Sequence, residues 1–149
     1  MAWWDKIGEG RLVEKALAAL PQTDSLNIFT VTGGRVIVTQ LIGEVTTVIG
    51  NVPNSTHIQH TPTAGAAVDL CAAGNDIDSD ADDTLYGMTG VPTDAMLDGL
   101  GAVPAQTQSI VLLPGAISVK CLGSDGGTGR VKWAIKYIPL DEGASVVAA

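Results

Sequence analysis

The sequence predicts an all-β protein: an antiparallel β-sandwich or jelly-roll-like body with a short N-terminal helix and extended terminal arms. Short runs rich in Val, Ile and Thr recur along the chain, and Gly, Pro and Asn separate them. About eight such runs can be counted, which is typical of sandwiches and jelly rolls. The 149 residues, 46% of them hydrophobic, suffice for one domain with a substantial core.

The helical pattern lies in "RLVEKALAAL", residues 11–20. The apolar residues that would share one face of this helix are Leu12, Val13, Ala16, Leu17 and Leu20. Pro21 would end the helix. A helix this short is marginal in isolation, so its apolar stripe would need a surface on which to dock.

The two ends of the chain carry the side chains expected to contact a partner. Paired aromatic residues can pack on their own domain or anchor on a neighbouring subunit, and both alternatives remain open for the first two tryptophans. The tail "DEGASVVAA" is too short to form an element alone and could lie along the edge of a neighbour. The expected partner contacts are Trp3, Trp4, Leu12, Val13, Leu17, Val146 and Val147.

The organisation that follows from these patterns has three parts. Residues 1–25 would form an N-terminal arm and helix, residues 26–140 the β-sandwich domain, and residues 141–149 a C-terminal tail. No internal repeat of 20–50 residues is apparent, which argues against a solenoid or propeller.

Strand signals begin near residue 27. "NIFTVTGGRVIVTQLIGEVTTVIG" holds two β-rich runs separated by Gly33 and Gly34, which predicts a hairpin whose turn needs positive φ. Shorter strand candidates follow in "STHIQHT", "AAVDLCA" and "TLYGMTG". The segment from 89 to 108 has neither period and is expected to be a long surface excursion, with at most one helical turn around 94–97.

The last third of the chain predicts three further strands. "SIVLLPGAISVKCLGSDGGTGR" supplies two of them, broken at Pro114 and Gly115 and followed by a glycine-rich turn. "RVKWAIKY" then alternates cleanly. The residues on its apolar face are Val131, Trp133, Ile135 and Tyr137. This strand should have one buried side and one that faces water.

Charge distribution limits the classes of partner. Only 16% of residues are charged, below the roughly 25% of ordinary soluble domains, so part of the surface is expected to be covered by self-association. No Lys or Arg lies between Val36 and Val119, where nine acidic residues stand. An acidic middle repels phosphate backbones, so no direct nucleic-acid binding is expected. No secretory leader or membrane span is recognised, which predicts synthesis in the cytoplasm.

The acidic run "NDIDSDADD" is the first candidate for chemistry. Asp76, Asp78 and Asp80 match positions 1, 3 and 5 of a calcium-binding loop. The template then requires Gly and Glu, where this chain has Ala81 and Gly87. A solvated loop is therefore expected, and an irregular calcium site built from the three aspartates stays open as an alternative.

Other reactive residues show no catalytic pattern. His57 and His60, at i, i+3 in an extended segment, would point to opposite faces, which is poor geometry for a shared metal. Cys71 and Cys121 lie in separate apolar segments and are expected to be buried thiols, with a disulfide as the alternative. "GSDGGTGR" lacks the ending of a phosphate-binding loop. We expect no enzyme activity, no cofactor and no metal.

Four stretches together resemble a group of small tailed-bacteriophage virion proteins of the capsid decoration, or cement, type. They are "KALAALPQT", "IFTVTGGRVIVTQLIGEVTT", "VDLCAAGNDIDSDADDTLYGMTG" and "VKWAIKYIPLDEGASVVAA", and they span nearly the whole chain. The resemblance implies a β-sandwich or jelly-roll body, commonly a homotrimer, that binds the major capsid protein on the outside of the shell and clamps neighbouring capsomers. It brings no catalytic residues.

Two alternatives to decoration remain. The chain could be another virion component, such as a tail, neck or fibre subunit, or a calcium-dependent glycan-binding β-sandwich module that uses the acidic run. A low aromatic content of 4% speaks against the second, because sugar-binding surfaces favour exposed aromatic side chains.

Overall fold

The computed structural model describes residues 10–149, in which every regular element is a β-strand. Two antiparallel sheets pack as a β-sandwich, which confirms the predicted all-β class. Sheet A contains β1 (Arg11–Ala19), β3 (Val36–Thr47), β7 (Thr84–Gly87), β8 (Leu97–Leu100), β9 (Ile110–Leu112) and β11 (Arg130–Pro139). Sheet B contains β2 (Ser25–Thr32), β4 (Ser55–Pro62), β5 (Val68–Asp69), β6 (Asn75–Asp76), β10 (Gly115–Cys121) and β12 (Ser145–Ala148).

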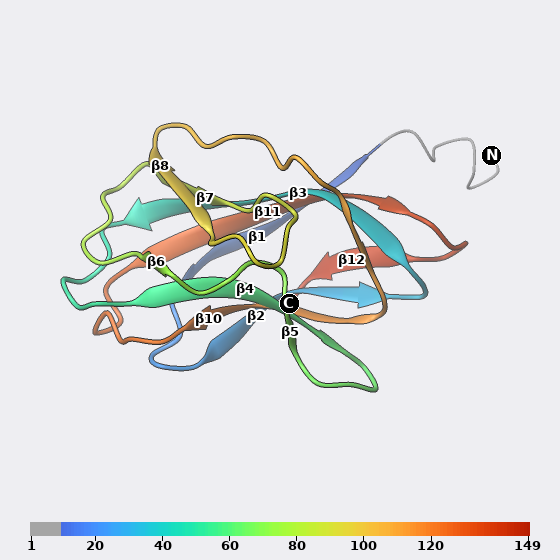
Figure 1. The fold of residues 1–149 in the computed structure, drawn as a ribbon, viewed down its shortest axis with the longest axis horizontal. Coiled ribbons are helices and arrows are strands. Elements are labelled where there is room, and N and C mark those ends of the chain that lie inside the picture. Colours follow the sequence, from blue (N-terminus) through green and yellow to red (C-terminus); the bar gives the residue numbers. More distant parts are fainter. Residues whose placement is uncertain (1–9) are drawn as a thin grey trace.

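Strand order places the two ends of the described chain at sheet edges. Sheet A runs β1-β11-β3-β7-β8, with β9 also paired to β3, and sheet B runs β12-β2-β10-β4-β5, with β6 also paired to β4. Figure 1 shows the two layers, with β3 and β11 in one and β4 and β10 in the other. A parallel bridge between Ala72 and Ala95 joins the segments that follow β5 and precede β8. The sandwich is thus connected on the side opposite β1 and β12.

The predicted helix over Arg11–Leu20 is wrong, because this segment forms strand β1. Every residue at its start, from Arg11 opposite Tyr137 to Lys15 opposite Trp133, follows the antiparallel register of β11. Without β1, the unpaired edge of the long strand β11 would face solvent, and pairing satisfies its backbone groups. A ten-residue helix has too little intrinsic stability to compete with that pairing.

The core follows the alternation of β11. Val131, Trp133, Ile135 and Tyr137 are buried, whereas Lys132 and Lys136 are exposed, as the sequence predicts. Leu41 and Val45 of β3 face the same interior, with Gly43 between them. The rings of Trp133 and Tyr86 lie 6.3 Å apart between centroids, with 30° between their planes. Sheet B contributes Ile28, Phe29, Val31, Ile58, Ile117 and Val119 to this core.

The predicted hairpin at Gly33 and Gly34 is also wrong. Strand β2 belongs to sheet B and β3 to sheet A, so the two runs do not pair and the glycines connect one layer to the other. Both glycines do adopt positive φ, at 77° and 146°, which confirms the conformational prediction. Arg35 and Asp141 hold this connection to the one between β11 and β12 through a bidentate ion pair of 2.8 Å between Nη2 and Oδ1. Local sequence gave the turn but not the pairing partner.

The segment from 89 to 108 contains a strand, β8, rather than a helical turn. Gln106 links the end of this segment to β3 by two hydrogen bonds. Its backbone N–H donates to Gln40 Oε1 at 2.7 Å, and its side-chain amide donates to the carbonyl of Val38 at 3.1 Å. Side-chain-to-backbone bonds of this kind replace the ladder that an irregular segment lacks.

Candidate functional site

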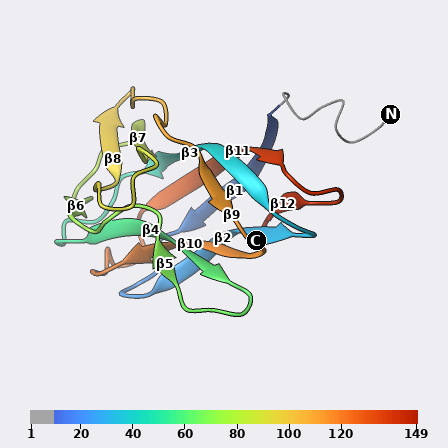
Figure 2. The same ribbon diagram turned by 45° about the vertical axis from the view of Figure 1, so that its right-hand side comes forward.

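The two edge strands β1 and β12 lie next to each other at one side of the sandwich (Figures 1 and 2). The ammonium group of Lys15 donates a hydrogen bond of 2.6 Å to the backbone carbonyl of Ala149, which links the end of β12 to β1. The strands nearest the two chain ends, β1 and β12, therefore lie on the same side of the molecule. We call this side the terminal edge and define it by the exposed residues Leu12, Leu17 and Val147.

Three of the expected contact residues are accessible at the terminal edge. Leu12 is 64% exposed, Leu17 57% and Val147 47%. Val13 instead packs against the core, and Val146 is buried in it. Strand alternation explains the division, since Val146 pairs with Val31 on the inner face and the next residue points outward. Trp3 and Trp4 lie outside the described residues.

A β-bulge shapes the middle of β1. The register with β11 shifts between Lys15 and Ala18, so that two residues, Ala16 and Leu17, stand opposite Lys132. The bulge turns Leu17 away from the core. An edge strand with exposed leucines is the kind of surface on which another chain can add.

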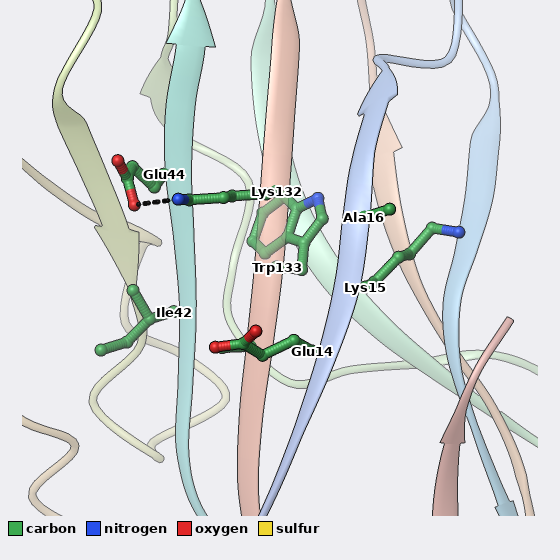
Figure 3. A pocket seen from close by; sticks show the side chains of 8 residues that line it. Glu14, Lys15, Ala16, Ile42, Glu44, Lys132 and Trp133 are labelled. Atoms are coloured by element: carbon green, nitrogen blue, oxygen red, sulfur yellow. Dashed lines mark ion pairs between the residues drawn. The ribbon is translucent and has the colours of Figure 1, made fainter.

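A hollow of about 430 Å³ lies beside this bulge on the outer face of sheet A (Figure 3). Its lining residues come from three neighbouring strands and are Glu14, Lys15, Ala16, Ile42, Glu44, Lys132, Trp133 and Ala134. Ala134 stands between Glu14 and Ile42 in the strand register, and its small side chain leaves room above the sheet. Across the rim, Lys132 Nζ and Glu44 Oε2 form an ion pair of 3.2 Å.

The three calcium candidates are used in bonds within the protein. Asp76 Oδ1 accepts the backbone N–H groups of Asn54 at 2.8 Å and Asp78 at 3.0 Å. The side chain of Asp78 accepts the hydroxyl of Ser79. Asp80 accepts the hydroxyl of Tyr86. Within residues 10–149 no three carboxylate, imidazole or thiol groups are arranged to hold a metal ion.

Asp80 is the most perturbed of these carboxylates. Burial raises the pKa of Asp80, the hydrogen bond from Tyr86 Oη at 2.6 Å opposes this shift, and the charge of nearby Asp98 adds to it. The acidic run is thus not wet throughout, because Ile77 and Asp80 fold it back against the body. The backbone N–H of Ile49 donates to the carbonyl of Asp80.

The two histidines of β4 do face opposite ways. His57 Nε2 lies 3.3 Å from Asp69 Oδ1, whereas His60 is 3% exposed and neither of its ring nitrogens has a hydrogen-bond partner among residues 10–149. Burial lowers the pKa of His60. Cys71 and Cys121 are free and buried, as the sequence suggested, and burial raises the pKa of Cys71 to about 11. A thiol with so high a pKa is a poor nucleophile at neutral pH.

Asp125 is a structural residue that sequence reasoning missed. It is 4% exposed in the glycine-rich turn, and its carboxylate accepts three hydrogen bonds: from Gln22 Nε2 at 2.6 Å and from the N–H groups of Gly127 and Gly129 at 2.9 and 2.6 Å. Burial acts to raise the pKa of Asp125, but these donors outweigh it and hold the pKa below its ordinary value. The glycine-rich turn is therefore a hydrogen-bonded link between β10 and β11, which belong to different sheets.

Comparison with known proteins adds little. No family model and no curated protein sequence matches the chain. A solved structure described as "Structure of infectious bursal disease virus Gx strain" shares 12% identity with it, at a TM-score of 0.24. The match covers 93% of this chain and 34% of that one, so the chain spans about a third of the length of the matched chain. We draw no argument from a similarity at this level. Among residues 10–149 there is no helix of the length and apolarity needed to cross a membrane.

Proposed function

We propose that the protein is a structural subunit of a tailed-bacteriophage virion, of the capsid decoration type. In this proposal a jelly-roll-like sandwich, assembled as a homotrimer, seats on the capsid exterior and binds the major capsid protein. The protein is made in the host cytoplasm. The resemblance described above suggests this role, and the two-sheet body with an apolar edge is compatible with it.

The observation that carries the proposal is the terminal edge. Leu12 and Leu17 are exposed on a strand at the end of sheet A, where the side of β1 away from β11 bears no strand pairing among residues 10–149. A partner can bind such an edge by strand addition, with backbone hydrogen bonds giving affinity and apolar side chains giving register. Weak contacts of this kind become stable when symmetry multiplies them.

Electrostatics favours the same orientation. The acidic run ends directly before β7, which is separated from β1 by β3 and β11 in the order of sheet A. A shell that meets the terminal edge therefore does not have to approach the carboxylates of Asp76 to Asp83. These charges would face outward, where they keep decorated particles from associating.

Capsids that lack the protein provide the test. Purified protein is mixed with such particles and co-sedimented, with wild type compared with Leu12→Lys/Leu17→Lys and with Leu100→Lys. Leu100 is a matched control, because it is 72% exposed on β8 at the opposite edge of sheet A. We expect wild type and Leu100→Lys to bind and the double variant to lose at least about tenfold in affinity. Equal binding of all three would refute the role of the terminal edge, and no binding by wild type would refute decoration.

Copy number separates decoration from the other virion roles. Quantitative mass spectrometry of intact particles should find the protein on the order of hundreds of copies if it covers the shell lattice, and about a dozen if it is a neck component. A count near a dozen would replace decoration with a tail or neck role.

A further inference from the structure

The hollow on sheet A has the size and lining of a site for an aromatic side chain. Its volume of about 430 Å³ lies in the range of roughly 300–1,000 Å³ typical of ligand sites. Ala16, Ile42 and Ala134 give it apolar walls, and Glu14 and Glu44 place carboxylates at its rim. An apolar body with a hydrogen-bond donor at one end would fit both features, and the indole of tryptophan is such a group.

Most of the charged groups at the rim already have partners. Glu44 is paired with Lys132, and Lys15 is directed to the carbonyl of Ala149. Glu14 has no ion pair among residues 10–149. An occupant that brings an N–H donor or an ammonium group would therefore complete the rim.

We propose that this hollow receives Trp3 and Trp4 of a neighbouring copy of the chain. The segment that precedes the described residues reads "MAWWDKIGE": it carries two adjacent indoles, each with one N–H donor, and Lys6 two residues later. Trp4 would fill the apolar floor and Lys6 would approach Glu14. The proposal extends the proposed function by naming the site through which copies join.

The direction of β1 favours a neighbour over the same chain. Strand β1 begins at Arg11, which pairs with Tyr137, and runs toward the hollow, which lies near Lys15 and its partner Trp133. Lys15 is four residues, or about 13 Å, further along the strand than Arg11. Gly10, the first described residue, therefore lies on the side of β1 away from the hollow, and a segment before it would have to reverse its direction to reach the hollow of the same chain. Nine extended residues span about 30 Å, enough to reach an adjacent molecule.

Full-length variants test the two halves of the contact separately. Trp3→Ala/Trp4→Ala removes the indoles, and Ala134→Trp fills the hollow. Ala116→Trp is the matched control, because Ala116 is a half-buried alanine on the central strand β10 of the other sheet. Sedimentation velocity should show wild type and Ala116→Trp as oligomers and the other two as monomers, with association weakened at least about tenfold. Thermal unfolding of each variant checks that the body is folded.

Mixing the two monomeric variants is the decisive measurement. The first retains an open hollow and the second retains its indoles, so together they can form one intact contact. Native mass spectrometry should detect a one-to-one complex in the mixture and none in either variant alone. A monomeric wild type, oligomers that survive Ala134→Trp, or a mixture that stays monomeric would each overturn the proposal. No capsid is present, so failure here leaves the shell-binding test unaffected.

Discussion

The indole of Trp133 lies against the backbone of Gly43, so that a β-carbon at Gly43 would come within 2.6 Å of the ring. The two residues face each other in the register of β3 and β11, and Tyr86 stands opposite Gly43 on the other side. The large indole of Trp133 therefore fits at this position because its cross-strand neighbour, Gly43, has no side chain. Packing at this point is a matter of volume, not of backbone conformation.

Gly43→Ala should destabilise the fold by overpacking. The methyl group meets a ring held in the centre of sheet A, and such insertions cost about 1–3 kcal/mol. For a domain of this size each kcal/mol corresponds to about 2–4 °C in Tm, which thermal unfolding followed by circular dichroism would measure. Gly87→Ala on β7 is the control, since its β-carbon would meet no atom closer than 3.4 Å. Equal losses in both variants would contradict the packing argument.

Asp125→Ala should destabilise the link between β10 and β11. The substitution leaves the donors of Gln22, Gly127 and Gly129 without their acceptor, at a cost of about 1–3 kcal/mol for each donor that stays buried. Chemical denaturation at pH 7 would measure it. Asp24→Ala is the charge-matched control, because Asp24 is exposed and accepts one bond, from Ser25.

The pH dependence of the same carboxylate has a defined sign. The pKa of Asp125 is lower in the folded protein than in the unfolded chain, where it is near 3.8. Its contribution to the free energy of unfolding is therefore complete above the unfolded pKa and is lost as the pH falls through the lower folded pKa. The difference in unfolding free energy between wild type and Asp125→Ala should therefore shrink below about pH 4. A difference that stayed constant down to pH 2 would contradict this assignment.

Tyr86→Phe should cost stability at neutral pH. Its hydroxyl, in a side chain 1% exposed, donates to the carboxylate of Asp80, and hydrogen bonds to charged groups are worth about 1.5–3 kcal/mol. Because the hydroxyl favours the ionised form of Asp80, the loss should be largest above the pKa of Asp80 and decrease as that group is protonated. Tyr137→Phe, whose hydroxyl has no partner among residues 10–149, should change stability little.

His60 should make the protein less stable in mild acid. Burial lowers the pKa of His60, so the unfolded chain binds a proton at a higher pH than the folded one does. The unfolding free energy should therefore fall as the pH drops below about 6.5, by up to about 1.4 kcal/mol per pH unit. His60→Leu should remove this part of the dependence, and His57→Gln should retain it. An unchanged profile in His60→Leu would show that another group is responsible.

Strand content could be predicted where neighbours along the chain decide the structure. In β11 the alternation of Val131, Trp133, Ile135 and Tyr137 leaves one arrangement that buries all four. Gly33 and Gly34 likewise reveal positive φ, since other residues rarely adopt it. Leu12 and Leu17 are exposed, and their role as partner contacts stays a prediction.

Pairing between distant segments was decided by the tertiary structure alone. The stretch from Arg11 to Ala19 has a helical pattern, but it forms a strand because it pairs with the edge of β11. That edge lies more than a hundred residues away in sequence. Whether a turn connects two paired strands of one sheet or links the two sheets likewise depends on which strands pair with each other. Asp125 gained its donor Gln22 in the same way, whereas its other two donors, Gly127 and Gly129, are neighbours along the chain. The periodicity of apolar residues indicates which side of a segment faces the interior. Backbone hydrogen-bonding groups are the same in almost every residue, so they do not specify which strands pair until the two sheets assemble.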